Sequence, residues 1–370
     1  MNNFFTSTQK HGNTVFTFSS PIKVLSTSPL NGGITKHLSH IANINCMNGS
    51  YECQMLGATY EEDLAGHVRS LGIIPSSATA LSTAAWTELA ATEELRFHNL
   101  TVTAVATGGI DTNGIHPGDP SSYFEANGNY KPLTPGTINI FLFINQPLTD
   151  AAMTRALMLC AEAKAAAVSQ LLLRSCYSEE IATGSGTDGT VIASILQGDT
   201  VLTDASGHSK LGELIGKSVK SAVKQALLNQ TAASGPRQFQ LSVRLSRFKI
   251  TPGTLWDFYT KYQQVFEKFK IDFASPSLLE QRFSVHNCNS NLVLCVSLYL
   301  HLMDQFRWKL IMEQEALREG RRLLICGLYW RQGQFLEEAY PAEAWNQPEL
   351  LDFSLREQLM YLLLLYIYQA

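Results

Sequence analysis

Residues 136–145 read GTINIFLFIN, and this stretch decides the fold more than any other part of the chain. Every residue from Ile140 to Ile144 is apolar, so both faces of the segment are hydrophobic. A strand that is apolar on both faces is typical of the middle of a sheet covered on both sides. We therefore predict a central β-strand here, within an α/β domain.

The segments that follow predict two helices separated by another strand. Thr149 or Asp150 is placed to cap an alanine-rich helix that runs to about residue 173. Ser209 is placed to open a second helix, because apolar residues recur after it at helical spacing. Between them, the β-branched run at residues 190–196 favours a strand.

The earlier part of the chain predicts a mixture of elements. Short strand-like runs and turns alternate up to about residue 60, whereas residues 60–72 and 79–95 have the composition of helices. Residues 100–107 predict a strand. Residues 111–135 are rich in Gly, Pro, Asn and Ser and predict a long surface loop, a kind of loop that often binds ligands.

Residues 231–236 read TAASGP, and the change to small residues, Gly and Pro marks a domain boundary. We place the first domain at residues 1–234 and a C-terminal extension at residues 235–370. The extension begins with a strand-like alternation at residues 239–245 and continues with mostly helical segments. The predicted fold class is therefore α/β, a mixed sheet with flanking helices followed by a mainly helical extension.

Composition excludes several classes of protein. Hydrophobic residues make up 45% of the 370 residues and charged residues 16%, which suits a large core and argues against disorder. A net charge of −4 offers no basic surface for nucleic acid. The most apolar stretch, residues 359–368, is about half the length of a membrane span. Seven cysteines without a C-x-x-C pair, and no secretion signal, predict a reduced cytoplasmic protein.

A glycine-rich stretch, ATGSGTDGTVI at residues 182–192, contains a literal G-x-G-x-x-G. A dinucleotide site requires a helix to open after the glycines, and here a β-branched run follows instead. No lysine follows as in a Walker loop. We predict a loop between elements that presents Ser185, Thr187 and Asp188 to a ligand.

Lys164 is the most informative side chain of the alanine-rich helix. It falls on the same stripe as the apolar residues Met153, Leu157, Cys160, Val168 and Leu171. A lysine there must extend to solvent, pair with a carboxylate or lose its charge. Glu162 is two positions away and points elsewhere on the helix, where a surface or interface ion pair is the ordinary interpretation.

His208 precedes the second helix and could carry a proton near neutral pH, although a lone histidine is more often structural. Glu213 could equally pair with Lys217 on the solvent side. Ser185 lacks the G-x-S-x-G pattern of a nucleophile elbow. Metal ligation by His208, Asp188 and Glu162 has suitable ligand types but no local spacing signature, so the sequence does not establish a metal site and none is assigned.

Taken together, these segments resemble the adenosylcobinamide amidohydrolases of corrinoid salvage. The resemblance covers about residues 20–230 and does not reach the extension, whose role the sequence leaves open. In the family's order, the matching stretches are NGG (31–33), GTINI (136–140), TDAAM (149–153), AEAK (161–164), TGSGTD (183–188) and HSKLGE (208–213). Ser185 departs from the family, which usually has threonine there, but the hydroxyl group is kept.

The resemblance implies hydrolysis of the amide that joins aminopropanol to the corrin ring of adenosylcobinamide, giving adenosylcobyric acid. The residues that it implies are Glu162, Lys164, Asp188, His208 and Glu213 for catalysis, and Asn31, Gly32, Asn139, Thr183, Gly184, Ser185, Gly186 and Thr187 for substrate binding.

In that hydrolysis His208 would carry the proton, Lys164 and the loop backbone would bind the oxyanion, and Asp188 or Glu162 would orient the base. The corrinoid is then the substrate, and no resident cofactor is predicted. The sequence does not decide whether a metal assists. The rival hypothesis is a noncatalytic corrinoid-binding or chaperoning protein. The apolar C-terminal segment could also seal a homodimer.

Overall fold

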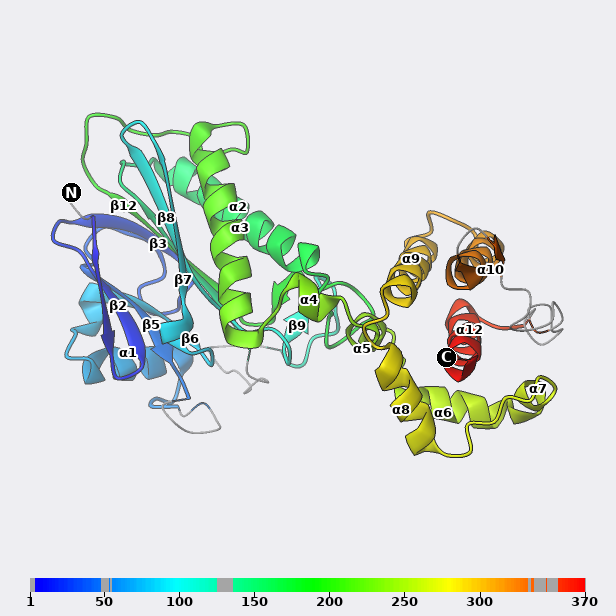
Figure 1. Cartoon of the computed structure of the whole chain (residues 1–370). Helices are drawn as coiled ribbons and strands as arrows, with labels where there is room; N and C mark the ends of the chain where they lie inside the picture. Colours follow the sequence, from blue (N-terminus) through cyan, green and yellow to red (C-terminus); the bar gives the residue numbers. More distant parts are fainter. Residues whose placement is uncertain are drawn as a thin grey trace. The chain divides into compact units, whose positions relative to one another are not determined.

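The computed structural model describes residues 4–47, 53, 55–124, 136–331, 334–335, 344 and 352–369 (Figure 1). The chain divides into two compact units, Met1–Ser234 and Gly235–Ala370. Each unit has its own hydrophobic core.

The first unit is built on a six-stranded mixed sheet, which we call the main sheet. Its central strand β10 pairs in parallel with β12 and antiparallel with β8, and all of its residues are buried. This confirms the central strand predicted from the sequence. In spatial order the strands are β4 (Gly33–Thr35), β3 (Ile22–Ser26), β12 (Gly189–Ile195), β10 (Ile138–Ile144), β8 (Leu100–Gly108) and β7 (Ala91–Phe97).

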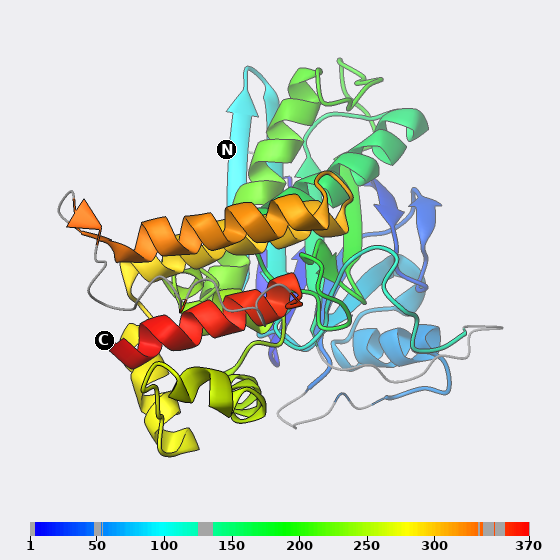
Figure 2. The ribbon, with the colours of Figure 1, turned by 90° about the vertical axis from the view of Figure 1, so that its right-hand side faces the viewer.

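Two long helices, α2 (Asp150–Gln170) and α3 (Lys210–Thr231), lie side by side on one face of the main sheet (Figures 1 and 2). Thr149 caps α2 by accepting a hydrogen bond from the amide of Ala152, and Ser209 caps α3 in the same way. Both predicted helix starts are therefore confirmed. Apolar side chains of both helices pack on β8 and β10.

The other face of the main sheet packs against a second, four-stranded sheet. Phenylalanines of both sheets fill the space between them, with Phe16 on one side and Phe141 and Phe143 on the other. Helix α1 (Tyr60–Ser70) covers the outer face of the second sheet, so the unit has helix, sheet, sheet and helix layers. The second sheet runs β1 (Thr6–Lys10), β2 (Asn13–Thr17), β5 (His40–Asn45) and β6 (Ala78–Thr83).

The predicted helix at residues 79–95 is wrong. Strands β6 and β7 occupy its ends, and the 3-10 helix η2 (Thr87–Leu89) lies between them. Another 3-10 helix, η1 (Pro75–Ser77), precedes β6. Helix propensity favoured this alanine-rich segment, but pairing of β6 with β5 and of β7 with β8 prevails.

The second unit is mainly helical, as predicted. Its core centres on α12 (Leu355–Gln369), whose residues from Leu359 to Ile367 are buried. The strand expected at residues 239–245 is wrong, since α5 occupies most of it. No helix among the described residues has the length and apolarity to cross a membrane. The remaining elements are α4 (Gly235–Gln238), α5 (Leu241–Ser246), α6 (Pro252–Lys261), α7 (Gln263–Glu267), α8 (Pro276–His286), α9 (Ser290–Arg307), α10 (Glu313–Tyr329), β13 (Trp330–Arg331) and β14 (Gln334–Phe335).

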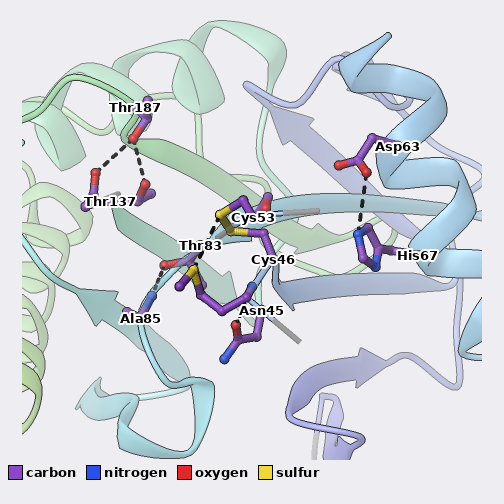
Figure 3. The surroundings of a disulfide bond; sticks show 12 residues. Asn45, Cys46, Cys53, Asp63, His67, Thr83, Ala85, Thr137 and Thr187 are labelled. Carbon is purple, nitrogen blue, oxygen red and sulfur yellow. Dashed lines mark hydrogen bonds and ion pairs between the residues drawn. A yellow bond between two sulfur atoms is a disulfide. The ribbon is translucent and has the colours of Figure 1, made fainter. Parts of the chain in front are cut away.

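Cys46 and Cys53 form a disulfide just after β5, beside the Thr83–Ala85 hydrogen bond (Figure 3). The sequence had predicted only reduced thiols, because it contains no C-x-x-C pair. The correction arises because the Cα atoms of these two cysteines lie 4.7 Å apart, a separation that a disulfide can span. The free cysteines are Cys160, Cys176, Cys288, Cys295 and Cys326.

Candidate active site

The glycine-rich stretch forms a loop at the end of the main sheet where β10 and β12 begin. We call residues 183–188 the glycine loop. It leads directly into β12, which lies beside β10 with Asn139 opposite Gly189. Within the loop, β11 (Gly184–Ser185) pairs with β9 (Gly114–Ile115). The strand that follows confirms that the loop does not open a helix.

Asp188 holds the glycine loop in place. Its Oδ1 accepts hydrogen bonds from the amide of Ile138, at 2.8 Å, and from the hydroxyl of Ser185, at 2.5 Å. Its Oδ2 accepts from the amide of Ser185, at 3.0 Å, and from Nζ of Lys164. Asp188 therefore joins the glycine loop to β10 through Oδ1 and to α2 through Oδ2.

Lys164 reaches this carboxylate from α2. Its side chain is 19% exposed and that of Asp188 is 10% exposed, so the ion pair is largely shielded from water. The lysine on the apolar stripe is thus paired with a carboxylate, one of the options that the sequence left open. Gly184 leaves the necessary space, because a Cβ there would lie 2.2 Å from Oδ2 of Asp188 and 2.6 Å from Nζ of Lys164.

Two further residues shape the loop: Asn113, which the sequence analysis did not single out, and Gly136, the first residue of the GTINI stretch. The carbonyl of Asn113 accepts from the amide of Gly186 at 3.2 Å, and its Nδ2 donates to the carbonyl of Gly136 at 2.9 Å. The same Gly136 carbonyl accepts from the hydroxyl of Thr187, which also bonds that of Thr137 at 2.6 Å (Figure 3). Gly136 has φ +147°, a backbone conformation that favours glycine. The glycine itself was therefore the signal available in the sequence.

The predicted substrate-binding residues of the glycine loop differ in exposure. Gly186 and Thr187 form the exposed tip, Thr183 is half-buried, and Gly184 and Ser185 are buried. The tip is therefore the part of the loop that a ligand can contact first.

Asn139 lies opposite Gly189, but its side chain is on the other face of the main sheet from Lys164, and Asn31 lies beside α1. Asn139 is 1% exposed, faces the second sheet, and donates to Oδ1 of Asn43 and the carbonyl of Ser82. Asn31 donates to the carbonyls of Pro75 and Ala78 and lines a pocket of about 500 Å³ beside α1, which contains no residue of the glycine loop. Gly32 is exposed next to Asn31.

The structure does not bring His208 and Glu213 to Lys164 and Asp188. Helix α3 begins at the opposite end of the main sheet, where Nζ of Lys210 lies 4.8 Å from the ring of Phe97. This end is separated from Asp188 by the length of β10, about 20 Å. This separation arises because α2 and α3 run along the sheet, so that residues near the start of α3 lie far from the glycine loop.

Glu213 and Glu162 have surface environments. Hydrogen bonds from Lys210 and Lys217 hold the pKa of Glu213 at about 2, below its usual 4.5. Glu162 is exposed on α2. The side chains weighed as metal ligands, His208, Asp188 and Glu162, are therefore not gathered at one place. Within the described parts of the chain, no group of three or more His, Cys, Asp or Glu side chains could hold a metal ion.

Comparison with known proteins identifies the family. The family model described as adenosylcobinamide amidohydrolase matches residues 2–235, more than half of the chain. The chain belongs to the adenosylcobinamide amidohydrolase family. This confirms the resemblance predicted from the sequence, and the match ends where the second unit begins.

One relative of this amidohydrolase-family chain is an uncharacterised protein of Methanocaldococcus jannaschii. It is 36% identical over an alignment of 174 positions, which covers 44% of this chain and 68% of the relative. Among solved structures, the PH0078 protein from Pyrococcus horikoshii OT3 matches with a TM-score of 0.31 and 13% identity, over 60% of this chain and 79% of that one. This structural likeness is too weak to support any inference.

In this amidohydrolase-family unit, the described residues place a cation and a hydroxyl at the glycine loop. A lysine ammonium has three N–H donors, and the bond to Asp188 uses one of them. The hydroxyl of Ser185 uses its one hydrogen in the bond to Asp188, so it adds no further donor. The remaining N–H donors of the fixed ammonium can stabilise negative charge that develops on a carbonyl oxygen.

Proposed function

We propose that this protein hydrolyses the amide that joins aminopropanol to the corrin ring of adenosylcobinamide, producing adenosylcobyric acid. The observation that carries the proposal is the family match over residues 2–235, which includes the whole glycine loop and its Lys164–Asp188 ion pair. The reaction needs water as co-substrate, a proton carrier, and donors for the oxyanion.

The proposed site is the surface around the glycine loop. Lys164 supplies a positive charge near the carbonyl oxygen that becomes an oxyanion, and the largely shielded ion pair keeps its ammonium in a fixed position. Asp188 acts as a positioning residue, since both of its oxygens are already bonded. The exposed tip, Gly186 and Thr187, contacts the peripheral amides of the corrinoid.

The roles inferred for the other predicted residues stay predictions. His208, Glu213 and Glu162 lie away from this cluster, and Asn139 is buried between the sheets. Asn31 remains a proposed substrate contact through the pocket beside α1, and Gly32 remains one as its exposed neighbour.

The direct test is turnover of adenosylcobinamide by the full chain, with adenosylcobyric acid and aminopropanol measured by mass spectrometry. Lys164→Met should lower kcat by about a hundredfold to a thousandfold, the usual effect of losing an oxyanion donor. Lys220→Met, on α3, is the matched control and should keep wild-type turnover. Repeating the assay in the presence of a chelator decides whether a metal assists the reaction.

The outcomes separate the two functions derived from the sequence. Product that depends on Lys164 supports the proposed hydrolase. Tight corrinoid binding without release of aminopropanol would contradict it and would indicate a corrinoid-binding protein instead.

A further inference from the structure

His116 is the histidine that the fold places beside the glycine loop. It follows β9, whose pairing with β11 aligns Ile115 with Gly184. The amide of Thr183 extends this pairing by donating to the carbonyl of Ile115 at 3.0 Å. His116 therefore lies alongside the start of the glycine loop, at the same end of the main sheet as Asp188.

One ring nitrogen of His116 is fixed by the backbone. Its Nδ1 lies 2.8 Å from the carbonyl oxygen of Ile181. Because a carbonyl oxygen can only accept, Nδ1 carries the hydrogen, and the lone pair of the neutral ring is on Nε2. Nε2 has no hydrogen-bond partner among the described residues, and the side chain is half-buried. The ring is thus held in the tautomer that a proton acceptor needs.

A tight turn holds this ring in position. Oδ2 of Asp119 accepts from the amide of His116 at 2.8 Å and from the hydroxyl of Ser175 at 2.6 Å. The amide of Cys176 donates to the carbonyl of Gly114 at 2.8 Å, which joins the same segment to β9. Partial burial raises the pKa of Asp119, but hydrogen bonds from Ser175, Ser178 and His116 outweigh it, so the pKa is lowered and the carboxylate stays charged near the ring.

The other histidine considered for this role is distant. His208 is exposed at the far end of the main sheet, about 20 Å along β10 from the glycine loop. A proton carrier must come within hydrogen-bond reach of the attacking water. His116 directly follows β9, the strand paired with the loop, whereas His208 lies at the far end of the main sheet.

We propose that His116 is the proton carrier of the hydrolysis, an inference that rests on the proposed function. Nε2 takes a proton from water as the water oxygen bonds to the amide carbon, forming a tetrahedral oxyanion next to Lys164. The imidazolium then gives this proton to the amide nitrogen as the C–N bond breaks. Aminopropanol leaves as the amine, and the new carboxylic acid loses its proton to solvent.

The test compares histidine variants of the full chain with adenosylcobinamide as substrate. His116→Asn keeps an N–H donor for the Ile181 carbonyl but removes the proton acceptor. We expect kcat to fall about a hundredfold to ten-thousandfold while KM changes little. His98→Asn is the matched control, because His98 is exposed at φ 52°, a conformation that asparagine adopts readily. His208→Asn tests the rival carrier.

Chemical rescue separates a proton carrier from a structural residue. Free imidazole should restore part of the turnover of His116→Ala and none of the turnover of Lys164→Met. If circular dichroism shows that His116→Asn folds poorly, the imidazole rescue of His116→Ala decides whether His116 carries the proton. Retained turnover in His116→Asn, or loss only in His208→Asn, would overturn the proposal while leaving the hydrolase intact. No product from the wild type would remove the proposed function and this proposal with it.

Discussion

Replacing Asp188 with asparagine tests whether the buried ion pair holds the glycine loop. The asparagine oxygen can still accept from Ile138 or Ser185, but its amide hydrogens would face Lys164 or the amide of Ser185, which are donors. Lys164 would then lose its counter-charge while its side chain is only 19% exposed.

The size of the effect follows from this burial. Removing one partner of a buried ion pair costs about 3–5 kcal/mol. Residual exposure of both side chains screens part of the charge and places the expected loss of unfolding free energy at about 3 kcal/mol. A loss of this size raises the equilibrium constant for opening of the structure about a hundredfold.

Hydrogen exchange of the peptide that contains β10 measures this loss in the full chain, because the first and second units have separate cores. The double variant Lys164→Met/Asp188→Asn should be more stable than Asp188→Asn alone, since no unpaired charge is left. A change below about 0.5 kcal/mol in Asp188→Asn, or additive effects in the double variant, would refute the reasoning.

Further predictions concern packing, charge, thiols and assembly. Gly184→Ala should destabilise the first unit by about 1–3 kcal/mol in the same exchange assay, whereas Gly207→Ala should not, because a Cβ at Gly207 meets no atom within 4 Å. Lys210 and Lys217 lower the folded-state pKa of Glu213 to about 2, so their stabilisation is present above its ordinary pKa of 4.5 and is lost as the pH falls toward 2; Glu213→Gln should flatten acid unfolding in this window, followed by circular dichroism. Burial raises the pKa of Cys160 to about 12, so a thiol reagent should modify the exposed Cys288 and Cys326 first and Cys160 only on unfolding, and early labelling of Cys160 would contradict its burial. A chain truncated after Ser234 should lose mass beyond the deleted segment in light scattering if the second unit seals a dimer, and an unchanged subunit number would remove that idea.

Local signals in the sequence predicted much of the fold. The doubly apolar run at β10, and the caps at Thr149 and Ser209, act within a few residues of the elements that they define. The helix predicted for residues 79–95 was wrong because helix propensity is a local property, whereas β6 and β7 form by pairing with the strands β5 and β8.

The candidate site was predictable only in part. Lys164 was marked by its place on an apolar stripe, and Asp188 by the glycine motif, but their pairing depends on where α2 crosses the sheet. His208 was favoured because it begins a family motif and could carry a proton, although α3 begins at the far end of the sheet. His116 belongs to no sequence motif that marks it as functional. Only the pairing of β9 with β11 shows that it lies beside the glycine loop.

The most direct measurement is a single incubation of the full chain with adenosylcobinamide in water labelled with a heavy oxygen isotope. Mass spectrometry should find free aminopropanol together with adenosylcobyric acid that carries the heavy isotope in its new carboxyl group. Unchanged adenosylcobinamide recovered from a protein that binds it would contradict hydrolysis at the glycine loop.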